Sequence, residues 1–341
     1  MAELLTSAQN PKFKRLVALR EKSRLRRDEG VFVVEGRREL EHCVEAGFEV
    51  ETVFVCPEIG SAPDWSLPSS DVSLRSTPPF AELTVPPLTM PRVARPSEGS
   101  TSPATRVPTE QPKTFELSKE LYAKVAYREG TEGVMAIVKS REWTLADLDV
   151  MLSSRGNAGE NADNQRVPLH QSQGAQGSRP QGARQQRARQ QGAPLIMVLE
   201  GVEKPGNLGA VLRSADAAGA DAVIVCDPLT DLWNPNLIRA SIGAVFTVPT
   251  VCCSSAEAIA WLKARGIRIL TAQLQDSSVY YDADMTGPTA IVMGTEATGL
   301  TDPWRQAADA HVLIPMLGRL DSLNVSVSAA ILLYEAVRQR Q

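Results

Sequence analysis

Three polar, glycine-containing loops hold the residues of this 341-residue chain that are best placed for chemistry. They lie near residues 201–209, 294–300 and 318–324, and each follows a short apolar run and precedes a helical pattern. Loops of this kind leave backbone N–H and C=O groups free, which suits recognition of a polar ligand by the main chain. Because open α/β sheets bind ligands at the carboxyl ends of their strands, the pattern predicts a ligand site at these strand ends.

The third loop is the most informative, because the hydrophobic period changes across it. The apolar run that ends at Met316 is too short for a helix and predicts a buried strand, and Gly318 follows at once. Ser322 or Asn324 is expected to cap a final helix. The expected buried face of that helix consists of Val325, Ala329, Leu332, Leu333 and Ala336. Taken alone, this segment also fits an ordinary strand-loop-helix connection.

The same loops carry a family resemblance. In the expected order, the chain has stretches that resemble the three motifs of the SpoU/TrmH branch of SPOUT methyltransferases: NLGAVLR at 207–213, GTEATGL at 294–300, and IPMLG at 314–318 followed by SLNVSV at 322–327. That family transfers a methyl group from S-adenosyl-L-methionine to a ribose 2′-hydroxyl in tRNA or rRNA. The resemblance covers roughly residues 195–340. It implies a C-terminal SPOUT domain with a trefoil knot, and a homodimer whose cofactor site lies near the interface.

The resemblance also implies roles for single residues. Cofactor contacts, made largely through the backbone, are expected from Gly294, Gly299, Ile314, Met316, Gly318 and Leu323. Catalytic or substrate-orienting roles are expected from Arg213, Asn207, Glu296 and Asn324. The apolar Ile314 and Leu323 are equally compatible with places in the core. For Asn324 the alternative is helix capping alone.

Arg213 receives the leading catalytic role from the resemblance. Methyl transfer to a ribose hydroxyl needs in-line positioning and help in removing the hydroxyl proton. Arginine is a poor free base because its pKa exceeds about 12, so Arg213 is assigned to binding the target phosphate and stabilising the developing alkoxide. It is expected one helical turn after Gly209, whose missing side chain would leave room for a ligand. The alternative is a surface ion pair with Asp216.

Strand and helix patterns alternate through the C-terminal part of the chain. Strands are expected at 195–200, 222–226, 246–251, 267–270, 289–293 and 311–315, and helices from 207, at 235–244, 255–265 and 303–309, and from 325. This alternation predicts the α/β class, with a mostly parallel sheet that is covered on both faces.

The N-terminal part predicts a smaller α/β domain. A strand at 31–36, a helix that ends at Gly47 and a strand that ends at Cys56 give a β-α-β order. This order resembles the L30e-like RNA-binding domain often attached to the family. The first 27 residues predict a basic helix with Ser7 or Asn10 as its start signal, and this helix either contacts phosphates or is simply solvated. Its basic residues are Lys12, Lys14, Arg15, Arg20, Lys22, Arg24, Arg26 and Arg27.

Two stretches of low complexity divide the chain. Residues 57–112 are rich in Pro, Ser and Thr and predict a disordered insertion. Residues 146–193 predict a linker rich in Gln, Arg and Gly, whose arginines either remain solvated or touch RNA. The expected organisation is therefore an L30e-like domain at 1–145, this linker, and a SPOUT domain at 194–341.

Composition and charge indicate the location of the protein in the cell better than they indicate its activity. A net charge of −4 and a pI near 5.6 mean that any RNA affinity must come from local basic patches. Five cysteines without a CxxC pair or a set of His partners predict reduced thiols, with no disulfide framework and no metal site. The sequence has no apolar run that would span a membrane and no signal-peptide core at its start. We therefore expect a cytoplasmic protein with no membrane partner.

The expected function is S-adenosyl-L-methionine-dependent 2′-O-methylation of RNA, with rRNA favoured over tRNA as the partner. A non-catalytic RNA-binding protein with the same fold is the first alternative. The second is a Rossmann-type nucleotide enzyme, which the glycines after residue 200 suggest. That loop lacks GxGxxG, and Asp221 is a poor match for a ribose-binding acid.

Overall fold

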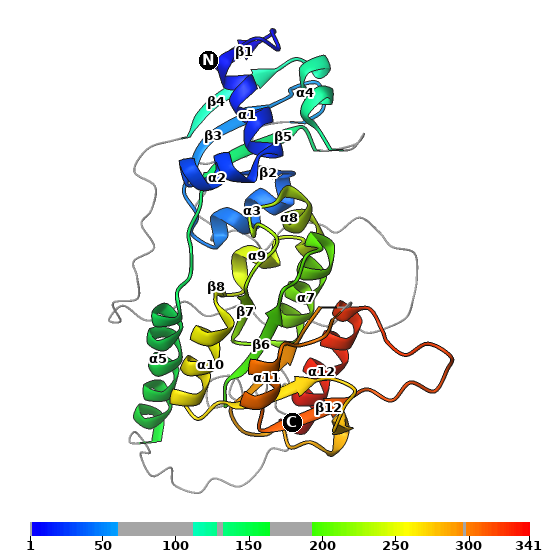
Figure 1. Ribbon diagram of the computed structural model, residues 1–341. Coiled ribbons are helices and arrows are strands. Elements are labelled where there is room, and N and C mark those ends of the chain that lie inside the picture. Colours follow the sequence, from blue (N-terminus) through cyan, green and yellow to red (C-terminus); the bar gives the residue numbers. More distant parts are fainter. Residues whose placement is uncertain (1, 61–111, 128–131, 164–192, 296–297) are drawn as a thin grey trace, which may run out of the picture.

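The computed structural model describes residues 2–60, 112–127, 132–163, 193–295 and 298–341. They form a smaller N-terminal α/β domain and a larger C-terminal α/β domain (Figure 1). Between the two sheets lie helices α3 (Arg37–Glu45), α8 (Pro235–Ser241) and α9 (Ala244–Thr247). The expected insertion at 57–112 lies outside the described residues except for its ends. No helix in the described ranges is long and apolar enough to cross a membrane.

The N-terminal sheet has five strands in the order β1-β4-β3-β5-β2. They are β1 (Glu3–Leu5), β2 (Val31–Glu35), β3 (Val50–Val55), β4 (Lys113–Leu117) and β5 (Val134–Lys139). The accompanying helices, besides α3, are α1 (Pro11–Glu21), α2 (Ser23–Glu29) and α4 (Lys119–Val125). The expected β-α-β order is present as β2, α3 and β3. Asn10 caps α1, since its side chain accepts a hydrogen bond from the backbone N–H of Lys12 at 2.9 Å.

The basic residues of α1 and α2 are only partly available to a ligand. Arg26 is 3% exposed and pairs with Asp231 of the C-terminal domain at 2.7 Å. Arg15 pairs with Glu29 and Glu51 at 2.7 and 2.6 Å. Exposed basic side chains remain at Lys14, Lys22, Arg24 and Arg27. Part of the basic stretch therefore has a structural role.

The C-terminal sheet has seven strands in the order β10-β12-β9-β11-β6-β7-β8, and every pair is parallel. They are β6 (Leu195–Glu200), β7 (Ala222–Cys226), β8 (Thr250–Cys253), β9 (Arg268–Ala272), β10 (Ser278–Val279), β11 (Thr289–Met293) and β12 (Ala310–Leu313). Helices α7 (Pro205–Ala218) and α12 (Val325–Gln339) pack on one face. Helices α5 (Leu145–Asp163), α10 (Ser255–Ala264) and α11 (Asp302–Ala307) pack on the other. The expected α/β class with a parallel sheet covered on both faces is confirmed.

One hydrophobic core runs through the junction between the two domains. The rings of Phe32 and Trp233 stack with centroids 4.4 Å apart and planes 11° apart, and Phe48 and Phe246 pack around them. The Arg26 guanidinium crosses the same junction to Asp231 and also donates to the carbonyl oxygen of Leu19 at 2.7 Å. Aromatic stacking and a buried charge pair therefore fix the domains against each other.

The expected strand at 246–251 is wrong in its first half. Phe246 belongs to the short helix α9, and β8 begins only at Thr250. Phe246 is 5% exposed, because α9 turns its ring into the domain junction. Tertiary packing at this junction overrides the local preference of the sequence for a strand.

The expected strand that ends at Met316 stops earlier. Strand β12 ends at Leu313, and Ile314 and Met316 follow it outside the sheet. On one side the neighbouring strand β9 ends at Ala272, which pairs with Val312. On the other side β10 ends at Val279, which pairs with Leu313, so neither neighbour extends past Leu313. Pro315 also lacks the N–H that a continued strand would need.

The stretch expected to be a linker from residue 146 begins with a packed helix instead. In α5, Leu148 is fully buried against the second face of the sheet. Asp149 accepts a hydrogen bond from Trp261 Nε1 at 3.0 Å and pairs with Arg265. The remaining part of this stretch, 164–192, lies outside the described residues.

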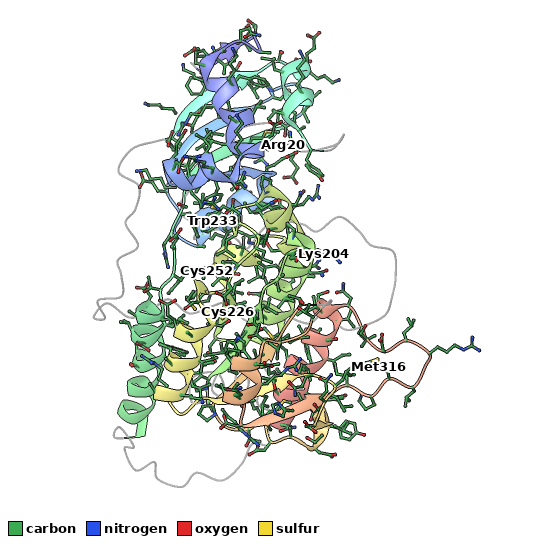
Figure 2. All side chains as sticks on the ribbon, in the orientation of Figure 1. Arg20, Lys204, Cys226, Trp233, Cys252 and Met316 are labelled. Atoms are coloured by element: carbon green, nitrogen blue, oxygen red, sulfur yellow. The ribbon has the colours of Figure 1, made fainter. Side chains whose placement is uncertain are left out.

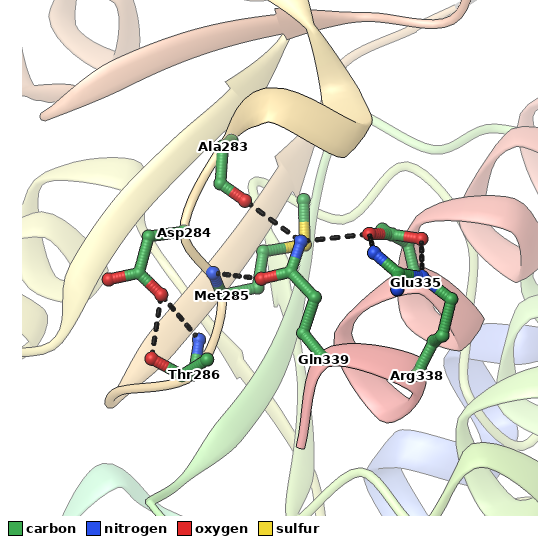
Figure 3. A network of polar contacts seen from close by, with 7 residues as sticks. All are labelled: Ala283, Asp284, Met285, Thr286, Glu335, Arg338 and Gln339. Atoms are coloured by element: carbon green, nitrogen blue, oxygen red, sulfur yellow. Dashed lines mark hydrogen bonds and ion pairs between the residues drawn. The ribbon is translucent and has the colours of Figure 1, made fainter. Parts of the chain in front are cut away.

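Contacts at the end of α12 fix it to the segment before β11 (Figure 3). The Gln339 side chain donates to the carbonyl oxygen of Ala283 and accepts from the Met285 N–H, at 2.9 and 2.8 Å. It also donates to Glu335, which pairs with Arg338 at 2.7 Å. These bonds anchor the carboxyl end of α12, and α12 also packs against α7.

All five cysteines are free thiols, and Cys43, Cys56 and Cys226 are buried. Burial raises the pKa of the Cys43 thiol well above its ordinary value. Within the described ranges, no three His, Cys, Asp or Glu side chains form a group that could hold a metal ion.

Candidate functional site

A pocket of about 120 Å³ lies where β6 and β11 end. Its walls come from the loop after β6, the start of α7, the loop after β11 and the start of α12. They are formed by Gly201, Val202, Glu203, Lys204, Asn207, Gly294, Thr295 and Val325. Of the residues singled out in the sequence, Asn207 and Gly294 therefore line one cavity.

The loop after β11 closes tightly on itself. Thr295 and Gly299 exchange two backbone hydrogen bonds, of 3.3 and 3.1 Å, and Gly299 has a positive φ of 69°. A Cβ atom at Gly294 would lie 2.3 Å from the backbone carbonyl carbon and oxygen of Gly299. Position 294 therefore has no room for a side chain. Glu296 lies outside the described residues.

Asn324 connects the third loop to the first. It is the N-cap of α12, with its Oδ1 accepting from the Ser326 N–H at 2.9 Å. At the same time its Nδ2 donates to Asn207 Oδ1 at 3.2 Å. Asn207 lies in the first turn of α7, so the two asparagines join the N-terminal ends of α7 and α12. Asn324 therefore both caps α12 and links it to α7.

The chain between β12 and α12 projects from the body of the domain, on the side that also carries Lys204 (Figure 2). Ile314 packs against the core and Met316 is half-buried. Leu323 is 39% exposed, and a Cβ atom at Gly318 would meet nothing within 4 Å. Within the described part of the chain, no backbone N–H between 315 and 323 donates to a backbone carbonyl. The main chain of this loop therefore remains available to a ligand.

Arg213 lies on the exposed side of α7, two turns from its start. As the sequence predicts, the buried stripe of α7 includes Leu208, Val211, Leu212 and Ala215. Among the described residues Arg213 forms no hydrogen bond and no ion pair, so the alternative pair with Asp216 is not formed. Asp216 accepts from the Thr247 hydroxyl instead, at 3.3 Å.

The expectation that Gly209 leaves room for a ligand is wrong. Gly209 is buried against α8, and a Cβ atom there would lie 2.6 Å from Ala240 Cβ and 2.8 Å from Ser241 N. The missing side chain allows α7 and α8 to pack closely. Arg213, one turn further along α7, therefore lies beyond this helix contact and not above a ligand cavity.

Sequence reasoning missed Glu200, the last residue of β6. Its side chain is 5% exposed and is held by the segment that follows the 294–300 loop. Thr301 donates to it twice, from its N–H at 2.9 Å and from its hydroxyl at 2.6 Å, and the Ser255 hydroxyl donates at 3.1 Å. Glu200 thereby ties the end of the β11 loop to the strand beside the pocket. An acidic residue that ends an apolar strand was the available signal.

Known protein families match the N-terminal and C-terminal parts of the chain separately. The sequence pattern of the SpoU rRNA Methylase family matches residues 194–334, and that of an MRM3-like substrate binding domain matches residues 10–85. A crystal structure of an RNA 2′-O ribose methyltransferase is 30% identical to this chain, with a TM-score of 0.63, and the match covers 99% of both chains. The chain belongs to the SpoU rRNA methylase family.

Two further proteins are similar to this chain, one in sequence and one in fold. A 23S rRNA (guanosine-2′-O-)-methyltransferase RlmB from Ralstonia nicotianae is 43% identical over 150 residues, which are 44% of this chain and 60% of the relative. The chain thus spans less than two thirds of that relative's length. The AdoMet-bound rRNA methyltransferase from Sinorhizobium meliloti has a TM-score of 0.67 over 99% of this chain and 98% of its own, with 23% identity. At that identity the likeness concerns the fold.

Proposed function

We propose that this SpoU-family protein transfers a methyl group from S-adenosyl-L-methionine to a ribose 2′-hydroxyl of rRNA. The observation that carries the proposal is the contact between Asn207 and Asn324, which joins α7 and α12 beside the pocket that Gly294 lines. The RlmB relative and the 30% identical structure are named as RNA 2′-O-methyltransferases, which supports the reaction class.

The residues around the pocket suit S-adenosyl-L-methionine. Gly294 and Gly299 bring two backbone segments into direct contact, and the unpaired main chain at 315–323 offers donors and acceptors to an adenine and a ribose. Ile314 and Met316 supply apolar surface at the base of this loop. We assign Gly294, Gly299, Ile314, Met316, Gly318 and Leu323 to cofactor binding. The bound cofactor would supply an electrophilic methyl group on a sulfonium.

The remaining assigned residues would orient the RNA and stabilise the charge that develops on the ribose oxygen. Arg213 is exposed and has no internal partner in the described ranges, so its guanidinium is free to bind the target phosphate and stabilise the developing alkoxide. Asn207 and Asn324 can both donate and accept, and they would orient the ribose and the third loop. We assign Glu296 to ordering the 294–300 loop. The 2′-oxygen would form a bond to the methyl carbon as the methyl–sulfur bond breaks, S-adenosyl-L-homocysteine would leave, and the hydroxyl proton would pass to solvent.

Ribosomal RNA is favoured over tRNA as the substrate. The support is the rRNA named for the RlmB relative and for the SpoU rRNA Methylase family. Residues 10–85 match an MRM3-like substrate binding domain. We therefore propose that the domain at 1–145 recognises RNA, that 146–193 includes the connection, and that 194–341 performs the chemistry.

Exposed apolar side chains support a homodimer. Leu317 and Leu320 of the projecting loop are 97% and 78% exposed, and Tyr334 of α12 is 50% exposed. Because exposed apolar groups are typical of protein interfaces, we propose that this loop and α12 contact a second copy. We further propose a cytoplasmic location and a trefoil knot. The position of β12 between β9 and β10, both of which precede it in sequence, supports the knot.

Calorimetric titration and a substrate comparison test this proposal. We expect S-adenosyl-L-methionine to bind, NAD not to bind, and methyl transfer to an unmodified 23S rRNA transcript to exceed transfer to a tRNA mixture. Binding of NAD alone would favour a Rossmann-type enzyme. RNA binding without cofactor binding would favour a non-catalytic protein, and transfer to tRNA alone would replace the substrate class.

A further inference from the structure

Two arginines and a tyrosine meet at the junction of the two domains. The Tyr127 ring, which follows α4, lies 3.9 Å from Cζ of Arg239 and 5.5 Å from Cζ of Arg20, measured to the ring centroid. Arg20 belongs to α1 and Arg239 to α8, so each domain contributes one guanidinium. Tyr127 is 46% exposed. The cluster is therefore accessible from solvent.

Neither guanidinium is neutralised by a direct ion pair in the described part of the chain. Arg239 donates to Asn236 Oδ1 at 3.4 Å, while its buried Nη1 has no hydrogen-bond partner there. Arg20 donates to the carbonyl oxygen of Val125. Stacking on a ring occupies the face of a guanidinium and leaves N–H groups at its edge for an anion. The other interior arginine of this junction, Arg26, has its carboxylate partner in Asp231.

One carboxylate beside this cluster, that of Glu35, fixes the backbone of Tyr127. Glu35 accepts a hydrogen bond from the Tyr127 N–H at 2.9 Å and so fixes the backbone that carries the ring. Burial raises the pKa of the Glu35 carboxyl, against that hydrogen bond and the charges of Arg20 and Arg239. Glu35 thus supports the tyrosine, while the two guanidiniums keep unpaired donor capacity.

The cluster lies next to the helix that carries Arg213. Arg239 is adjacent to Ala240, against which Gly209 of α7 packs without room for a side chain. Arg213 follows Gly209 by one turn on α7. In Figure 2 Arg20 and Lys204 appear on the same side of the molecule. We take this side as the path of an extended polyanion from the domain junction toward α7.

We propose that Arg20, Tyr127 and Arg239 form an anion-binding platform for one backbone phosphate of the RNA, and that this platform holds the substrate on both domains at once. The inference rests on the proposed function, because it names an anchoring contact for the same RNA. Two guanidiniums provide charge-assisted hydrogen bonds to phosphate oxygens. The contact carries no base specificity.

RNA affinity and its salt dependence test the platform. The variants are Arg239→Gln and Arg20→Gln in the full chain, measured with a 23S rRNA transcript at several salt concentrations. Each should weaken binding about tenfold and reduce the slope of log affinity against log salt by about 1. Arg239→Lys, which keeps the charge, should restore part of the affinity. The matched control is Arg141→Gln, because Arg141 also stacks on a ring, that of Trp143, at 4.6 Å.

The outcomes separate the platform from the proposed function. Unchanged affinity and slope in both Gln variants, with wild-type methyl transfer, would overturn the platform alone. A lower melting temperature with an unchanged slope would mean that the cluster only joins the domains, and it would overturn the platform as well. If the wild-type protein bound no RNA, both proposals would fall. A raised KM for RNA with kcat retained at saturation would support the platform.

Discussion

Asn324 Nδ2 donates a hydrogen bond to Asn207 Oδ1 at 3.2 Å, across 117 positions of the sequence. The same Asn324 side chain caps α12 by accepting from Ser326. One residue thereby sets the start of α12 and holds it against the first turn of α7. The candidate site depends on this link, because Asn207 and Val325 line the same pocket.

Two replacements of Asn324 separate its role as the α12 cap from its hydrogen bond to Asn207. Asn324→Ala should cost about 0.5–2 kcal/mol of stability through loss of the cap, and should also lower methyl transfer. Asn324→Ser should retain the cap, but the serine side chain is too short to reach Asn207. We therefore expect wild-type thermal stability and a rate at least about tenfold lower, a difference of about 1.4 kcal/mol in the barrier. Full activity in the Ser variant would assign Asn324 to capping alone.

Arg213→Ala should reduce methyl transfer by about 10²–10³-fold, as expected for loss of a charge-stabilising donor. Cofactor affinity and melting temperature should change little, because Arg213 is exposed and has no partner among the described residues. Single-turnover kinetics and calorimetry measure the two effects separately. Asp216→Asn on the same exposed helix surface serves as the control. An unchanged single-turnover rate would remove Arg213 from the mechanism.

Two glycines of the proposed cofactor site should respond differently to alanine. At Gly294 the added methyl group would lie 2.3 Å from the backbone of Gly299, so the loop must shift and cofactor affinity should fall by at least about tenfold. At Gly318 the methyl group would meet nothing within 4 Å, so Gly318→Ala should bind more nearly like wild type. Calorimetric titration compares the two. Equal affinities in both variants would contradict the geometry of the 294–300 loop.

The Arg26–Asp231 pair should matter for stability more than any exposed pair. Its side chains are 3% and 9% exposed, so Arg26→Ala would leave a buried carboxylate uncompensated and should cost about 3–5 kcal/mol. Arg24→Ala breaks an exposed pair with Asp28 and should cost less than about 1 kcal/mol. Denaturant unfolding measures both. The double variant Arg26→Met, Asp231→Leu should recover part of the loss, and a further loss would argue against this account.

Periodicity was sufficient for the elements that bury one regular face. The stripe of α12 from Val325 to Ala336 follows from helical spacing, and of the two expected caps, Ser322 and Asn324, the structure has Asn324. The elements that were predicted wrongly depend on contacts with residues that are distant in sequence. Phe246 enters a helix because of rings at Phe32 and Trp233, and β12 ends at Leu313 because its neighbour ends.

The motifs named residues of the candidate site, but they did not predict how those residues contact one another. Asn207, Gly294 and Asn324 could be named from motifs, whereas their meeting depends on the whole sheet. Gly209 was misread because its partner, Ala240, lies on another helix. Glu200 was missed because an acid at a strand end has no distinctive spacing, and only the structure reveals its bonds to Thr301.

The most direct measurement of the central claim is the position of the transferred methyl group. The purified protein would be incubated with methyl-labelled S-adenosyl-L-methionine and unmodified rRNA, and the RNA digested to nucleosides for mass analysis. We predict a labelled nucleoside whose extra mass lies on the ribose, as a 2′-O-methyl group. Label on a base, or no label in RNA that the protein binds, would contradict the account.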